Sequence, residues 1–212
     1  MNNTMNKESE YHDDFLERKL QEKNELQAYS IAIKGLAENK SPLPYANKNH
    51  KHASVVISTI FDHTQNDIVF YEDGFNGNIS DNNDIQCLEK SLVSFLSRGG
   101  KLTMVLRETS ENISQFGKKV KSLKELRPEQ LIVKKSTEEF EKYIKDKKGD
   151  IFFIVGDKKM YRIEDNIKDA QNNRIGSAYG SFNQPKTAEE LYAIFMEKLA
   201  PCKDYFDIIN NS

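Results

Sequence analysis

The sequence contains little cysteine, proline or glycine, and it contains no tryptophan: its 212 residues include 2 Cys, 5 Pro and 10 Gly. Cys87 and Cys202 cannot form a disulfide framework, and by themselves they cannot complete a thiolate zinc site. No run approaches the ~18 consecutive apolar residues that a membrane helix requires, and residues 1–10 are polar where a signal peptide is apolar. We therefore expect a soluble, cytoplasmic protein with no structural metal and no membrane contact.

The charges almost cancel, with 31 basic and 33 acidic residues and a net charge of −2. A chain of this kind has no general basic field that would attract nucleic acid. Residues 118–148 are rich in lysine, but glutamates are interspersed, which favours a solvated helical surface. A local nucleic-acid contact in that segment is the alternative.

The length fits one hydrophobic core, and 12 Phe and 9 Tyr supply the apolar surface to build it. We expect two regions, an N-terminal tail with a helical extension at 1–44 and an α/β domain at 45–212. Residues 1–14 have almost no aliphatic side chains and are expected to be frayed. Apolar residues at helical spacing in 15–36 predict an amphipathic helix that docks on the domain or on a second subunit. Pro42 must end it.

Downstream, patterns typical of strands and helices alternate. The predicted strands are 67–72, 101–106, 130–134, 151–155, 160–163 and 177–182, and the predicted helices are 53–61, 85–96, 110–121, 136–145 and a last one opened by Pro185. Residues 156–159 are typical of a hairpin turn, which adds an antiparallel pair. Residues 45–51 and 73–78 are interpreted as loops, the second as a loop that can carry function. The fold class is therefore α/β, with a mixed β-sheet flanked by helices.

Common catalytic motifs are missing: the sequence has no phosphate-binding P-loop, no dinucleotide-binding glycine pattern and no serine nucleophile elbow. His12, His50 and His52 lie in polar segments and are interpreted as solvated. His63 follows an apolar segment and is a candidate for chemistry, because imidazole titrates near neutral pH. Cys87 is expected to pack within its helix. We expect no cofactor.

The segment 160–165 alternates apolar and charged residues. On a strand, this alternation places Arg162 and Glu164 on one face, where they can pair or bind an anion. The alternative is an edge strand whose outward charges prevent aggregation.

Two segments carry a resemblance to a known family. The helix end Phe95-Leu96-Ser97-Arg98-Gly99-Gly100 leads into a central strand, and Gly180-Ser181-Phe182-Asn183 follows the hairpin. In this order they resemble a phospholipase D-like domain, over about 53–199. Catalytic members carry a His-x-Lys motif before the Gly-Ser pair, but here Tyr161 and Ile163 stand in that context. Tyrosine, with a pKa near ~10, is a poor substitute for the histidine nucleophile.

The resemblance implies a catalytically degenerate domain that acts as a binding or regulatory subunit in a bacterial nucleic-acid-processing or defence assembly. It implies a cleft in which Arg107, Arg162, Glu164, Ser181 and Asn183 bind an anionic ligand. It also implies a homodimer, because catalytic members use two motifs related by a pseudo-twofold axis. A protein partner is a further possibility.

Two alternatives stay open. In the first, the chain is a nuclease or phosphodiesterase with a rearranged site, in which Tyr161 or His63 acts with the carboxylates Glu164 and Asp165. This hypothesis requires His63 within hydrogen-bond reach of the end of the site that carries Arg162 and Asn183. In the second, the chain is a structural adaptor whose N-terminal helix makes the partner contact.

Overall fold

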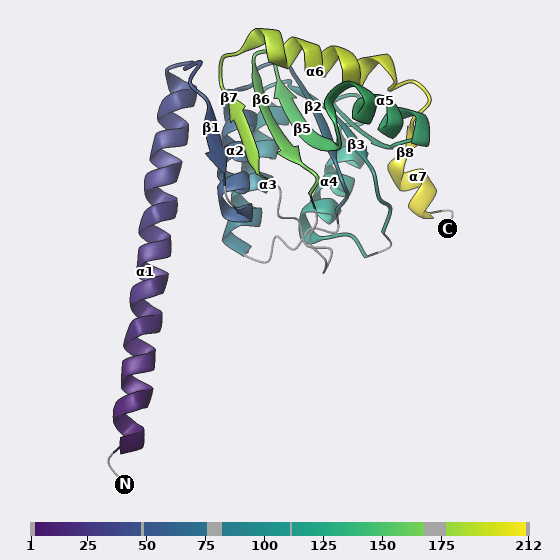
Figure 1. The fold of residues 1–212 in the computed structure, drawn as a ribbon. Coiled ribbons are helices and arrows are strands. Elements are labelled where there is room, and N and C mark those ends of the chain that lie inside the picture. Colours follow the sequence, from purple (N-terminus) through teal and green to yellow (C-terminus); the bar gives the residue numbers. More distant parts are fainter. Residues whose placement is uncertain (1–2, 48, 76–81, 111, 168–176, 211–212) are drawn as a thin grey trace.

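An eight-stranded mixed β-sheet flanked by helices organises the computed structural model, with the strand order β1-β7-β6-β5-β2-β3-β4-β8 (Figure 1). The structure describes residues 3–47, 49–75, 82–110, 112–167 and 177–210, with side chains from residue 16 in the first helix and from 86 in the third. The rest of the expected functional loop, from residue 76 on, lies outside the described residues. The α/β fold class predicted from the sequence is confirmed.

The elements follow one another in an almost regular alternation. The helices are α1 (Asn3–Glu38), α2 (His50–His63), α3 (Asn82–Ser97), α4 (Gln115–Leu126), α5 (Glu138–Lys148), α6 (Pro185–Glu197) and α7 (Tyr205–Asn210). The strands are β1 (Tyr45–Asn47), β2 (Asp67–Glu72), β3 (Lys101–Leu106), β4 (Leu131–Lys135), β5 (Ile151–Gly156), β6 (Met160–Asp165), β7 (Ala178–Ser181) and β8 (Lys203–Asp204). No described helix has both the length and the apolar composition needed to cross a bilayer.

The sheet has a parallel half and an antiparallel half. Strands β2, β3 and β4 are parallel neighbours, connected by α3 and α4. Strands β5, β6, β7 and β1 continue the sheet from β2 with antiparallel pairing throughout. The carboxyl ends of β2, β3 and β4 therefore lie at the same end of the sheet as the start of β5 and the end of β6.

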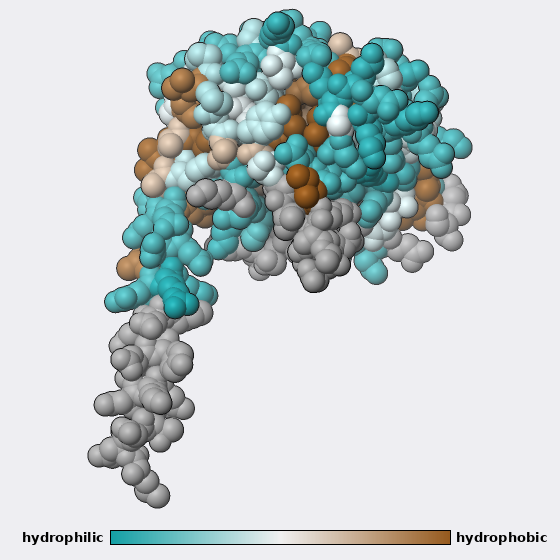
Figure 2. All heavy atoms as spheres, in the orientation of Figure 1, coloured by the Kyte–Doolittle hydropathy of each residue, from teal (hydrophilic) through white to brown (hydrophobic). Residues whose placement is uncertain are grey.

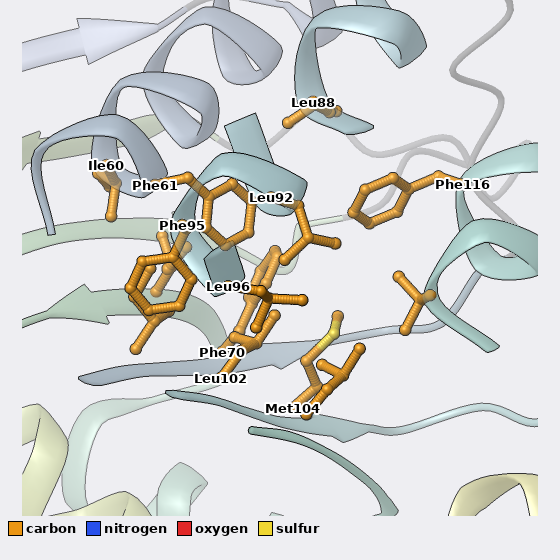
Figure 3. Close-up of a cluster of buried hydrophobic side chains, with 14 of the residues drawn as sticks. Ile60, Phe61, Phe70, Leu88, Leu92, Phe95, Leu96, Leu102, Met104 and Phe116 are labelled. Atoms are coloured by element: carbon orange, nitrogen blue, oxygen red, sulfur yellow. The ribbon is translucent and has the colours of Figure 1, made fainter. Parts of the chain in front are cut away.

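Two hydrophobic cores lie on the two faces of the sheet. The larger packs the sheet against α1–α4 and α7 and includes Phe61, Leu92 and Phe95 (Figure 3). The smaller packs it against α5 and α6 and includes Phe140 and Phe195. The interior strand β5 is buried along its whole length because it contributes to both cores.

Polar side chains fix where several helices begin. Asn49 accepts a hydrogen bond from the His52 N–H, and Thr137 accepts one from the Phe140 N–H, so each caps the first turn of its helix. Ser114 does the same for Gly117. That cap starts α4 at Gln115, several residues after the start expected from the sequence.

Three short elements differ from the sequence expectation. Residues 45–51, expected to be a loop, contain strand β1 and the start of α2, because the buried Tyr45 pairs opposite Gly180 at the edge of the sheet. Strand β8 and helix α7 were not expected. Tyr205 and Phe206 at the start of α7 are buried against Phe75, which anchors this last segment.

Helix α1 is longer than expected, and most of it projects from the domain (Figure 1). Its 36 residues span about 54 Å. Only its C-terminal part packs on the larger core, through Tyr29, Ile33 and Ala37. The helix begins at Asn3, so it includes most of the segment expected to be frayed, and the sequence contains no helix-breaking glycine or proline before Gly35.

The end of α1 is closed by a Schellman motif. The Ser41 N–H donates to the Leu36 carbonyl over 2.8 Å, and the Lys40 N–H donates to the Ala37 carbonyl over 3.0 Å. Lys40 takes the left-handed conformation that this motif requires, with φ 46°. Glycine is the residue that adopts this conformation without strain.

Replacing Lys40 with glycine is therefore expected to stabilise the protein by about 1 kcal/mol, because the left-handed strain disappears and the motif's hydrogen bonds remain. Urea denaturation followed by circular dichroism measures the change. The control is Lys51→Gly, which places glycine inside α2 and should be destabilising. A Lys40→Gly variant no more stable than wild type would show that this residue carries no strain.

Candidate functional site

Polar side chains gather at the edge of the sheet where the parallel strands end, the usual location of ligand sites in α/β folds. Arg107 follows β3, and Asp150 comes directly before β5. Because β5 runs antiparallel to β2, its first residues lie beside the last residues of β2 and β3. Glu141 reaches the same place from α5.

Arg107 lies between two carboxylates. Its Nε is 3.1 Å from Glu141 Oε2, and its Nη1 is 3.0 Å from Asp150 Oδ1. The Ser136 hydroxyl also donates to Glu141, and the Asn166 amide donates to Asp150. We call these five residues the Arg107 cluster. Within it each carboxylate is bonded to the arginine and to a neutral donor.

The cluster holds one positive and two negative charges, and Lys135 adds a second positive charge 3.9 Å from Glu141. Burial alone raises the pKa of Asp150, but hydrogen bonds from Asn166 and Arg107 outweigh it and hold the pKa below its usual value. Burial also raises the pKa of the neighbouring Tyr71, against the opposing charge of Arg107. For Arg107, burial favours the neutral form, yet its interactions with Tyr71, Glu141 and Asp150 raise its pKa.

Arg162 and Glu164 form a second polar group, which is buried within the sheet. Arg162 is 2% exposed, its Nε donates to Asn47 Oδ1 over 3.0 Å, and its Nη2 is bonded to Glu164. The pairing expected from the sequence is therefore present. The edge-strand alternative is wrong, because β6 lies between β5 and β7. Burial raises the pKa of the adjacent Tyr29 to about 12, which the charge of Arg162 partly opposes.

At the opposite ends of the strands lie Ser181, Asn183 and Tyr161. Tyr161 is paired with Ser181, whereas Glu164 is paired with Ala178 at the other end of the same ladder. The fully buried Ser181 hydroxyl accepts the Asn183 N–H. The Asn183 side chain donates to the Lys40 carbonyl over 2.9 Å, so these residues connect β7 to the end of α1.

Gly180 is required by close packing. The Tyr45 hydroxyl crosses this position to donate to the Tyr161 carbonyl over 2.9 Å. A Cβ at residue 180 would collide with that carbonyl and with the Tyr45 ring. The glycine of the Gly-Ser-x-Asn sequence is thus explained by strand packing without a ligand.

His63 lies at the end of α2, beside Thr64, which faces Gly156 at the hairpin between β5 and β6. It forms no hydrogen bond or ion pair with any residue that the structure describes. Arg162 is bonded to Asn47 and Glu164, Asn183 is bonded to Lys40, and no hydrogen bond joins His63 to either of these two described residues.

The Tyr161 hydroxyl donates to the side-chain oxygen of Gln184 over 2.9 Å, and burial raises the pKa of this tyrosine. Cys87 is exposed, contrary to the expectation that it packs in its helix, because Leu88 and Leu92 occupy the core side of α3. Cys202 is buried, and desolvation raises its pKa. Neither the phenol nor this thiol is activated as a nucleophile.

The residues expected to share one anion-binding cleft lie at opposite ends of the strands. Arg107 and Glu164 lie toward one end, and Ser181 and Asn183 lie toward the other. Both arginines are engaged by carboxylates, so an anion would have to displace one of these. Among the described residues, no group of three or more His, Cys, Asp or Glu is arranged to hold a metal ion.

Sequence reasoning missed Glu141 and Asp150, the partners of Arg107. Asp150 carried one usable signal: it directly precedes a strongly apolar strand. If that strand had been known to run antiparallel to 101–106, its first residues would have been placed beside Arg107. Glu141 had no comparable signal, since its position depends on how α5 packs.

Known proteins share the fold of this chain. No protein-family model matches the sequence, and no curated protein matches it significantly. The structure is similar to TrmBL2, described as an archaeal chromatin protein with a novel mode of DNA binding. The TM-score is 0.53 and the sequence identity is 16%, and the match covers 94% of this chain and 67% of that chain. It is also similar to Nuc, a phospholipase D family member from Salmonella typhimurium, with TM-score 0.51 and 14% identity over 77% of this chain and 99% of that chain. The fold is thus phospholipase D-like.

The lowered pKa of Asp150 predicts a pH-dependent contribution to stability. A depressed pKa in the folded state stabilises the protein above the unfolded value of about 3.9, and this contribution is lost as the pH falls through the folded value. We expect Asp150→Asn to be less stable than wild type by up to about 1 kcal/mol at pH 7, and the difference to shrink as the pH falls below about 3.9 and to vanish below the folded-state pKa. Urea denaturation across this range measures it. The control is the exposed Asp146→Asn, and a pH-independent difference would contradict the assignment.

Arg162 is expected to be structural. Arg162→Ala should cost about 3 kcal/mol in the free energy of unfolding, because it removes the buried arginine that bonds both Glu164 and Asn47. The double variant Arg162→Met/Glu164→Leu should recover most of this loss, since apolar side chains can replace a buried pair. The matched control is Lys198→Ala, which removes an ion pair with the exposed Glu139. Equal losses in Arg162→Ala and Lys198→Ala would contradict a buried, structural pair.

Proposed function

We propose that the chain is a non-catalytic phospholipase D-like domain that acts, as a homodimer, as a binding or regulatory subunit. The observation that carries this proposal is the Arg107 cluster. At the edge of the sheet where such folds hold ligands, the arginine is engaged by Glu141 and Asp150, and each carboxylate is bonded again by a neutral donor.

The arrangement of the candidate nucleophiles also supports the proposal. Tyr161 donates its hydroxyl proton to an amide oxygen, which is not basic enough to remove it. His63 is placed at the end of α2 without contact to Arg162 or Asn183. A general base must lie within hydrogen-bond reach of the group that it activates.

We infer that the setting is a nucleic-acid-processing or defence assembly of bacterial type. The support is the likeness to a chromatin protein described as binding DNA and to Nuc. Residues 45–212 amount to about 79% of the chain, so the match to TrmBL2 over 94% extends into α1. With a net charge of −2, the chain itself has no general attraction for nucleic acid, so we assign its contacts to a protein partner.

A hydrolysis assay tests the proposal. The full chain is incubated with single-stranded DNA, double-stranded DNA, RNA and bis(p-nitrophenyl) phosphate, with and without Mg²⁺, Mn²⁺ or Zn²⁺. We expect no turnover above that of a buffer blank. The matched variants are Tyr161→Phe and His63→Ala, prepared in the same way to reveal a contaminating nuclease.

Turnover in wild type that disappears in Tyr161→Phe or His63→Ala would overturn the proposal and establish the rearranged phosphodiesterase. Turnover that all three proteins share marks a contaminant and must be removed by further purification before the rates are compared. A wild-type rate equal to the blank supports the non-catalytic assignment.

A further inference from the structure

We propose that helix α1 of one chain pairs antiparallel with α1 of a second copy, through an outer seam formed by Leu16, Leu20 and Ile31. This inference rests on the homodimer of the proposed function and assigns its surface and its orientation. It uses only the part of α1 whose side chains the structure describes.

The outer seam is distinct from the face that docks on the domain. At 100° per residue, Leu16, Leu20 and Ile31 fall within roughly 60° of one another around the helix axis. Their mean direction is roughly 130° from that of the docked residues Tyr29 and Ile33 and their neighbour Ala37. The exposures agree, since the Ile31 side chain is 66% exposed although Ile33, two residues later, is 2% exposed.

The seam lacks cover within one chain. Leu16 is 51% exposed and Leu20 is 59% exposed. In Figure 2 the coloured part of this projecting helix is mostly hydrophilic, with one small apolar spot on the side away from the domain. Projecting helices gain little from their own hydrogen bonds in water, and most helical stability comes from packing an apolar face. A helix of this length that leaves the domain is therefore suited to pairing with another helix.

The charges along the seam favour a second copy in the antiparallel orientation. In a parallel pair every residue meets its own copy, which brings Lys23 against Lys23 and Lys34 against Lys34. Antiparallel pairing about the midpoint between residues 25 and 26 removes both repulsions. It places Lys34 at the level of Glu17 of the second copy along the helix axis, twice per dimer.

The same register matches the remaining seam residues. Leu20 lies opposite Ile31 of the second copy, and the Asn24 side chain lies opposite that of Gln27, so apolar residues meet apolar residues and amides meet amides. Leu16 lies opposite Gly35, which has open space beside its Cα. Each domain docks on a face of its helix roughly 130° from the seam, which leaves the seam side accessible to a second copy.

Disulfide trapping tests the orientation. In a Cys87→Ser background, which removes the exposed native thiol, Leu20→Cys and Ile31→Cys chains are purified separately, mixed and oxidised. The antiparallel register predicts a mixed disulfide dimer. Each variant alone should cross-link poorly, since residue 20 and its own copy are then about 16 Å apart along the axis, beyond the ~7 Å that a disulfide can bridge. Efficient cross-linking of each variant with itself, and not in the mixture, would overturn the antiparallel orientation.

Light scattering tests the surface. Wild type should be a dimer, and Leu20→Glu/Ile31→Glu should be a monomer with an unchanged circular dichroism spectrum of its folded domain. The matched control is Leu126→Glu, which changes a still more exposed leucine on α4 and should stay dimeric. A dimer that persists in Leu20→Glu/Ile31→Glu would overturn the α1 pairing and leave the proposed homodimer intact. A monomeric wild type would overturn the homodimer itself, while the hydrolysis result would still decide the non-catalytic assignment.

Discussion

The antiparallel pairing of β5 with β2 is the constraint on which the rest of the structure depends. It joins the parallel half of the sheet to the antiparallel half, with Tyr71 opposite Phe153. At one end it brings Asp150 beside Arg107. At the other end it places Asp157 of the β5–β6 turn where its carboxylate accepts the backbone N–H groups of residues 65–67. One strand pairing therefore positions both the candidate site and the connection that leads from α2 into the sheet.

This constraint also explains why the candidate site is self-contained. Strand β5 begins where β2 and β3 end, which places Asp150 beside Arg107. Helix α5 places Glu141 on the same arginine. Charges that satisfy one another in a half-buried place contribute to stability and leave little field for a ligand. The second arginine, Arg162, is placed in the same way between Asn47 and Glu164. The polar residues of the sheet are used mainly to hold strands together.

The sequence was sufficient for the alternation of strands and helices, because buried strands and amphipathic helices have strong local patterns. It also placed Arg162 and Glu164 on one face of a strand, which depends only on the two-residue repeat, but it left open whether they pair or bind an anion. It was not sufficient for β1 or β8, which are too short to show alternation. Nor could it identify the partners of Arg107, since Glu141 and Asp150 are 34 and 43 residues away and meet it only through the strand order.

The close packing at Gly180 gives a structural explanation for the short Gly-Ser-x-Asn sequence. The tetrapeptide Gly180-Ser181-Phe182-Asn183 is held here by a crossing tyrosine hydroxyl, a buried serine and an amide bonded to the end of α1. Each of its polar or small residues has a partner or a clash that accounts for it in a chain without the adjacent histidine and lysine. The tetrapeptide is therefore explained by how β7 packs between β6 and β1. In this chain, strand packing is enough to account for the tetrapeptide.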